Sequence, residues 1–144
     1  MIDMTLKTNT IEMISSSSIR ITIPKEIRNS LGVDTGDYLY VGLPDKELQE
    51  LAILEISTEK VASIEGTKIA NSGRIVIDNN LSNLVEINNY KKIGFVLTNK
   101  KLFLFLTDAM KKDVKKEEEY TGEERKGILE KATMIAEIVA KTYK

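Results

Sequence analysis

The side chains that carry most enzyme chemistry are missing from this sequence. It contains no histidine and no cysteine, which excludes imidazole acid–base catalysis, thiol nucleophiles, disulfides and the usual zinc ligand sets. Its carboxylate runs, Glu117 to Glu119 and Glu123 to Glu124, are adjacent on one expected helix surface and do not converge from different elements. A phosphate-cradling glycine loop and a nucleophile motif are also lacking. We therefore expect no catalysis, no bound metal and no cofactor.

Basic side chains on regularly patterned segments remain as candidates for binding. Arg20 lies in the alternating run Ile19 to Ile23, so it points away from the apolar face, toward solvent or a ligand. Lys25 and Arg28 follow in a short segment of helical spacing. These positions could contact an anionic partner. An exposed arginine is also commonly solvated, or paired with a neighbouring acid such as Glu26.

The elements that must position these side chains are a strand, a helical turn and a second strand. Residues 8–14 have the pattern of a strand, and the polar run 15–18 that of a turn or bulge. Pro24 fixes the backbone of the first helical turn, and the helix from Lys25 to Leu31 ends before a glycine. A glycine-aspartate turn then leads into a strand from Tyr38 to Leu43.

The same unit occurs a second time along the chain. A shift of 54 positions carries Arg20 to Ile23 onto Arg74 to Ile77, and apolar positions further along also match. The second copy ends in a hairpin around Asn99-Lys100. We assign repeat one to about residues 8–57 and repeat two to about residues 66–107.

A helical extension is expected after the second repeat, over residues 108–144. Thr121 and Glu124 have capping-box spacing directly before an apolar stripe at helical intervals. The stripe must be buried, either by folding back onto the preceding strands or by association with another chain. The candidates for oligomerisation or partner contact are Ile128, Leu129, Ala132, Ile135 and Val139.

Neither a secretory signal nor a membrane-spanning segment is expected. The first residues lack the charged-then-apolar pattern of a secretory signal. The longest apolar runs, Leu51 to Leu54 and Leu102 to Leu106, are strand-sized, whereas a spanning helix needs roughly 20 residues. A cytoplasmic location is the resulting expectation.

The segment from Ser18 to Asp37 resembles the signature of the AbrB/SpoVT swapped-hairpin family. The shared features are an arginine on an alternating apolar strand, a proline, a short helix, a leucine-glycine pair and a glycine-aspartate turn. The resemblance implies an intertwined β-barrel, with DNA contacts from Arg20 and Arg28 and a weaker contact from Lys25. The tandem arrangement is similar to that of MraZ proteins, and in the second repeat Arg74 alone matches a DNA-contacting position.

The sequence departs from this signature at several positions. The glycine before the arginine is Ile19 in the first repeat and is retained as Gly73 in the second. Asp78 replaces the proline and Ser82 replaces the helix arginine. Asp78 could therefore also pair with Arg74.

The predicted fold is mainly β with short helices, namely an AbrB-like swapped-hairpin β-barrel of two diverged repeats over residues 1–107, plus the C-terminal α-helical extension. The predicted function is a DNA-binding transcriptional regulator that forms a homo-oligomer, a dimer, through the C-terminal helix. The net charge of −1, from 21 basic and 22 acidic residues, does not favour nucleic-acid binding. Two alternatives stay open: a protein-binding module whose helix grips a partner, as antitoxin tails bind toxins, and an architectural oligomer.

Overall fold

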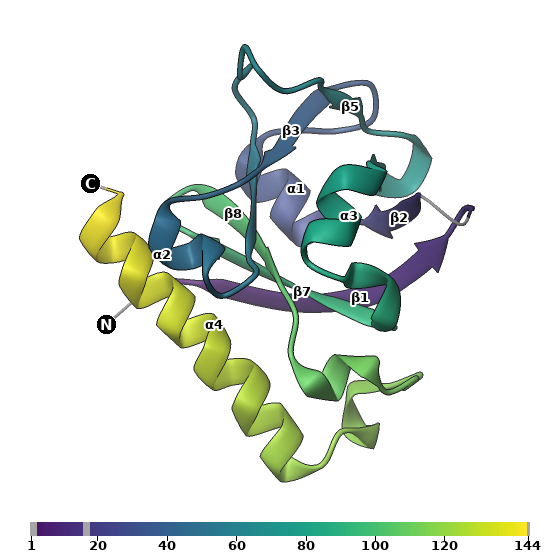
Figure 1. Ribbon diagram of the computed structural model, residues 1–144, viewed down its shortest axis with the longest axis vertical. Helices are drawn as coiled ribbons and strands as arrows, with labels where there is room; N and C mark the ends of the chain where they lie inside the picture. Colours follow the sequence, from purple (N-terminus) through teal and green to yellow (C-terminus); the bar gives the residue numbers. More distant parts are fainter. Residues whose placement is uncertain (1–2, 16–17, 144) are drawn as a thin grey trace.

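One antiparallel sheet contains the strands of the described residues, which are 3–15 and 18–143. The strands are β1 (Thr5–Met13), β2 (Ile19–Thr22), β3 (Tyr38–Gly42), β4 (Leu54–Ser57), β5 (Thr67–Lys68), β6 (Arg74–Ile77), β7 (Lys92–Thr98) and β8 (Lys101–Phe105). In this computed structural model their order is β5-β3-β4-β8-β7-β1-β2-β6. An isolated bridge between Ala70, beyond β5, and Arg74, at the start of β6, brings the two ends of the sheet together. Figure 1 shows how the sheet curves around the core. The predicted β-barrel is therefore confirmed, as a nearly closed sheet.

Four α-helices accompany the sheet. They are α1 (Lys25–Leu31), α2 (Lys46–Gln49), α3 (Asn79–Leu84) and α4 (Gly122–Thr142). No helix of the described residues is long and apolar enough to cross a membrane. The turn that the sequence predicts at residues 15–18 includes positions 16–17, which lie outside the described residues.

The first strand and helix form where their pattern predicts. The isoleucines of residues 19–23 are buried inside the barrel, while Arg20 and Thr22 between them are partly exposed. α1 begins directly after Pro24, whose ring presets the backbone for a helix start. It ends at Gly32, which has a φ of 72° and closes the helix in the left-handed conformation.

The two repeats pair with each other across an approximate two-fold axis. In the antiparallel pair β2–β6 the opposed residues are Ile21 with Ile75, Arg20 with Val76, and Thr22 with Arg74. The shift of 54 positions carries Arg20 onto Arg74 and Thr22 onto Val76, so exchanging the repeats leaves this register unchanged. The pairs β1–β7, β3–β5 and β4–β8 also join one repeat to the other. One chain thus completes the barrel from both of its repeats.

Aliphatic and aromatic side chains from both repeats fill the barrel. The buried members of this cluster include Ile19, Ile21, Ile23, Ile27, Leu39, Ile75, Ile77, Ile87, Phe95 and Leu104. Since both repeats contribute to one core, separating them would expose apolar surface from each.

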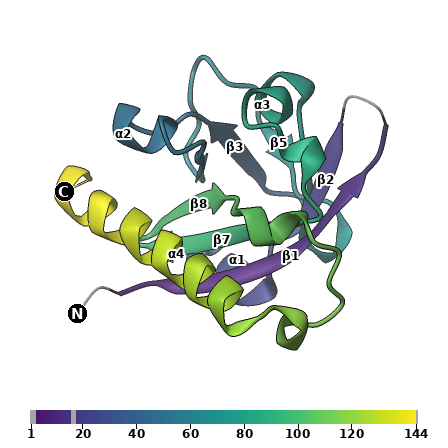
Figure 2. The same cartoon turned by 60° about the horizontal axis from the view of Figure 1, so that its bottom comes forward.

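α4 covers the outer face of the sheet (Figure 2). The Thr121 hydroxyl accepts a hydrogen bond from the Glu124 amide, and the Glu124 carboxylate accepts one from the Thr121 amide, which confirms the predicted capping box. The apolar stripe of the helix packs in one cluster with Val96, Phe103 and Phe105 of β7 and β8. Its buried residues are Ile128, Ala132, Ile135, Ala136 and Val139.

Of the two ways to bury the stripe that the sequence left open, the chain folds the helix back onto its own strands. Ile128, Ala132, Ile135 and Val139 are buried within their own chain, whereas Leu129 is 51% exposed. The amphipathic pattern required an apolar partner surface, and the outer face of the barrel supplies it. The packing of α4 on its own barrel therefore buries four of the five residues that were candidates for contact with another chain.

Tyr143 fastens the end of α4 to the barrel. Its hydroxyl accepts a hydrogen bond from the Asp45 amide and donates one to Glu55 Oε1, each at 2.9 Å. Its ring meets Phe103 edge-on with centroids 5.7 Å apart, and Lys101 Nζ lies 5.2 Å from its centroid. Burial, assisted by the neighbouring carboxylates, raises the pKa of Tyr143 to about 12.

Candidate nucleic-acid interface

The outer face of the β2–β6 ribbon carries two arginines in symmetric positions. Arg20 and Arg74 lie diagonally across the ribbon, each opposite one of the outward residues Val76 and Thr22. The apolar cluster beneath α4 involves β7 and β8, and both ribbon views place α4 away from β2 (Figures 1 and 2). This is a part of the barrel surface where strand residues of both repeats meet without a covering helix.

Arg20 is engaged by an acid from the neighbouring strand. Glu12 lies directly opposite it in the β1–β2 pair. Arg20 Nη2 is 2.5 Å from Glu12 Oε2, and Arg20 Nε donates to Oε1 at 3.4 Å. The hydrogen bond from Arg20 lowers the pKa of Glu12, and the charge of Arg74 acts in the same direction. Arg20 is therefore placed on the predicted face, but its guanidinium already holds a carboxylate.

Arg74 has a different environment although it occupies the equivalent position. Among the described residues it makes a hydrogen bond from Nε to Asn71 O at 3.1 Å and forms no ion pair. The residue paired across from it is Ala70. Asp78, which could have neutralised it, instead accepts a hydrogen bond from the Leu81 amide at 3.0 Å and caps α3. The guanidinium of Arg74 is the more available of the two.

Arg28, which the sequence also proposed for DNA contact, is largely buried and has partners within the protein. Its side chain is 13% exposed. Nε donates to Ile23 O at 3.0 Å, and Nη1 lies 3.3 Å from Asp34 Oδ1. The side chain packs over Gly73, where an added Cβ would lie 2.4 Å from Arg28 Nε. Arg28 therefore ties α1 to the end of β2 and to the turn before β6.

Lys25 is an exposed residue near the end of the ribbon. Lys25 is exposed at the first position of α1, directly after the strand that carries Arg20. Glu26, which the sequence offered as a partner for Arg20, pairs instead with Lys7 at 2.7 Å. Sequence reasoning assigned no role to Lys7 or Glu12.

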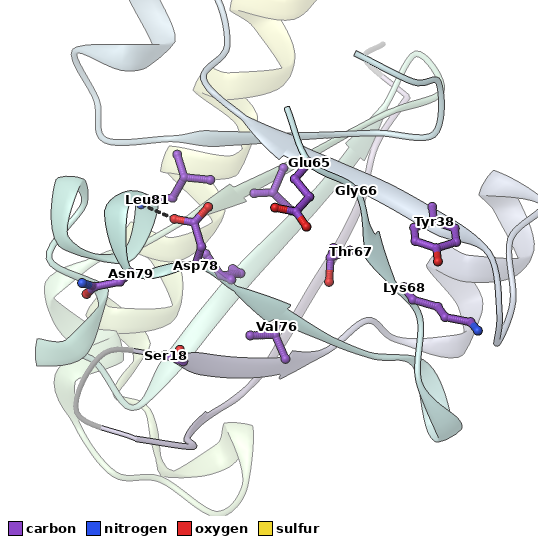
Figure 3. A pocket seen from close by; sticks show the side chains of 12 residues that line it. Ser18, Tyr38, Glu65, Gly66, Thr67, Lys68, Val76, Asp78, Asn79 and Leu81 are labelled. Atoms are coloured by element: carbon purple, nitrogen blue, oxygen red, sulfur yellow. Dashed lines mark hydrogen bonds between the residues drawn. The ribbon is translucent and has the colours of Figure 1, made fainter. Parts of the chain in front are cut away.

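An open hollow of about 500 Å³ lies where β5 and β6 diverge (Figure 3). Its lining includes Glu65, Lys68, Asp78, Tyr38 and Val76. Two carboxylates against one lysine disfavour a phosphate group there. We therefore place the candidate interface on the outer face of the ribbon and not in this hollow.

Comparison with known families points to the same part of the chain. Residues 13–48, a quarter of the sequence, match the family model described as "Antidote-toxin recognition MazE, bacterial antitoxin". The first repeat is similar to MazE-type antitoxins. The match includes β2, α1 and β3, and so covers Arg20, Lys25 and Arg28. No curated protein and no solved structure matched the chain.

Proposed function

We propose that this protein is a DNA-binding transcriptional regulator that contacts DNA through the outer face of the β2–β6 ribbon. The observation that carries the proposal is the symmetric placement of Arg20 and Arg74 on a surface without a covering helix. The planar guanidinium of arginine can donate two hydrogen bonds to phosphate oxygens or to the edge of a guanine base. Lys25 adds a positive charge near the end of β2. The MazE-like segment supports the proposal. The two repeats would take the places of two subunits, as the similarity to MraZ proteins implies.

The charge distribution predicts modest binding that depends on salt. The chain has a net charge of −1, so attraction to DNA must come from local basic residues and not from the whole molecule. Each phosphate contact contributes about −0.9 to the slope of log affinity against log salt. Three cationic contacts therefore set a limit of about −3 on this slope. We infer that the protein acts by binding without catalysis.

The test is binding to a pool of genomic DNA fragments across a salt series. Arg20→Ala with Arg74→Ala should abolish selective retention of fragments and reduce the slope by up to about 1.8. A matched variant, Arg125→Ala with Lys141→Ala, removes two positive charges from exposed positions of α4 and should bind as the wild type does. Absence of DNA binding by the folded wild type at low salt would refute the proposal, as would full binding by the double variant on the ribbon.

A protein-binding module is the second candidate, because the matching family model describes toxin recognition. The buried stripe of α4 limits where a partner or a second copy of the chain could meet this helix. Leu129 and Met134 are its exposed large apolar residues.

Two copies of the chain joined through these two residues would present two ribbon faces to a longer DNA site. A folded protein that fails to bind DNA would favour the protein partner.

A further inference from the structure

The two arginines of the ribbon face differ in the residues that lie opposite them. In the first repeat Glu12 lies opposite Arg20, and in the second Ala70 forms an isolated bridge with Arg74. The shift of 54 positions carries Glu12 onto Gly66, which like Ala70 has no charge. The face is thus symmetric in its arginines and asymmetric in its acids.

The Glu12 carboxylate binds the Arg20 guanidinium with the same hydrogen-bond pattern that a phosphate group would use. Both carboxylate oxygens accept hydrogen bonds from the guanidinium, at 2.5 and 3.4 Å. Such a bidentate arrangement is also how arginine binds the oxygens of a phosphate group. A DNA phosphate can therefore engage Arg20 only by displacing Glu12 or by sharing the arginine with it. The side chains of Arg20 and Glu12 are 34% and 50% exposed, so this exchange is sterically open.

Glu12 also acts beyond its own partner. Its carboxylate is close enough to Arg74 for that charge to favour its ionised form. In the order β1-β2-β6 the acid lies on the far side of Arg20 from Arg74, and it forms its hydrogen bonds with Arg20. Ala70 is exposed and contributes no charge, which leaves the Arg74 side of the ribbon open.

We propose that Glu12 is an intrinsic competitor of the DNA phosphate at Arg20, which directs backbone contact to the Arg74 half of the face and weakens binding. This inference rests on the proposed function. Glu12 is then a determinant of affinity and of the orientation of the protein on DNA, although it makes no favourable contact with DNA itself. Although the barrel is nearly symmetric, it then contacts DNA mainly through the Arg74 half of the ribbon face.

Substitutions opposite the two arginines test this inference. Glu12→Ala removes the acid opposite Arg20 and should tighten DNA binding about two- to five-fold, the range in which exposed ion pairs contribute. The salt slope should steepen by up to about 0.9, toward the limit for three full contacts, as Arg20 exchanges Glu12 for a phosphate. Ala70→Glu gives the second repeat an acid opposite Arg74 and should weaken binding. Glu12→Gln, which keeps the shape of the side chain, should act in the same direction as Glu12→Ala.

The matched control is Glu137→Ala, which removes one acid from an exposed position of α4. It separates a local effect on the ribbon from a general change in net charge. If the wild type binds DNA and Glu12→Ala and Glu12→Gln bind no more tightly than Glu137→Ala, the competitor role is refuted while the proposed function stands. If neither the wild type nor the Glu12 variants bind DNA at low salt, the proposed function and this inference fail together. Thermal unfolding of each variant confirms that the barrel is intact.

Discussion

Replacing Gly73 with alanine would test the packing that buries the Arg28 side chain. Gly73 has a φ of 82°, a conformation that costs an L-residue about 1–2 kcal/mol. The new methyl group would also lie 2.4 Å from Arg28 Nε. The guanidinium must then leave Ile23 O, and an unsatisfied or weakened hydrogen bond of this kind costs about 1–3 kcal/mol. We expect Gly73→Ala to lower the free energy of unfolding by about 2–5 kcal/mol.

A second glycine of the chain isolates the backbone contribution. Gly32 has a φ of 72°, and a Cβ there would meet nothing within 4 Å. Gly32→Ala should therefore cost about 1–2 kcal/mol, the backbone part alone. Arg28→Ala supplies the other control. Once the arginine is gone, Gly73→Ala should also cost the backbone part alone, so the two changes should couple by about 1–2 kcal/mol.

Equilibrium urea unfolding of the four variants of this cycle, with Gly32→Ala beside them, measures each free energy. Equal costs for Gly73→Ala and Gly32→Ala would refute the steric argument. Additive effects of Gly73→Ala and Arg28→Ala would refute the contact between these residues. Either result would return Arg28 to the set of side chains that are free to reach DNA.

Two further predictions concern α4. Ile135→Ala removes a fully buried side chain and should lower the free energy of unfolding in urea by about 2–5 kcal/mol. Leu129→Ala, at an exposed position, should change that free energy by no more than about 0.5 kcal/mol. Similar losses for the two variants would contradict the packing of the helix on the barrel. Because the pKa of Tyr143 is raised from 10.0 to about 12 in the folded state, its contribution to stability should be intact below pH 10 and be lost as the pH rises toward 12. Tyr143→Phe should lose the bonds to Asp45 and Glu55, cost about 1–3 kcal/mol, and flatten the decline of stability above pH 10.

Local patterns in the sequence predict the first repeat well. The alternation of residues 19–23 places Arg20 outward, and Pro24 with Gly32 brackets the helix at the bounds that the structure has. These signals are strong because each depends on neighbouring residues and on steric rules of the backbone. The recurrence of the pattern at Arg74 extends the same reasoning to the second repeat.

Contacts between distant residues could not be predicted in the same way. Glu12 meets Arg20 because the β1–β2 register pairs Met13 with Ile19, and a change of register by one residue would have turned the acid to the other face. The sequence does not fix that register, since the connecting polar run can close the hairpin in more than one way. The burial of Arg28 likewise depends on a turn that begins more than 40 residues later.

The apolar stripe of α4 illustrates the difference between predicting burial and predicting a partner. Its periodicity requires an apolar surface, but an outer barrel face and a second chain satisfy that requirement equally. The barrel strands β7 and β8 are buried on both faces, with Val96 and Phe103 turned outward toward the helix. Apolar residues on both sides of these strands are the sequence signal for a covering helix, because a strand open to solvent on one face alternates with polar residues.

The two repeats differ in the contacts that hold their short helices. Arg28 packs over Gly73, and the shift of 54 positions carries Arg28 onto Ser82 and Ile19 onto Gly73. Ser82 is buried and donates to Asp78 O at 2.7 Å, while the Asp78 carboxylate caps α3. Since Ser82 and Asp78 stand where the first repeat has Arg28 and Pro24, their hydrogen bonds give a packing reason for both differences.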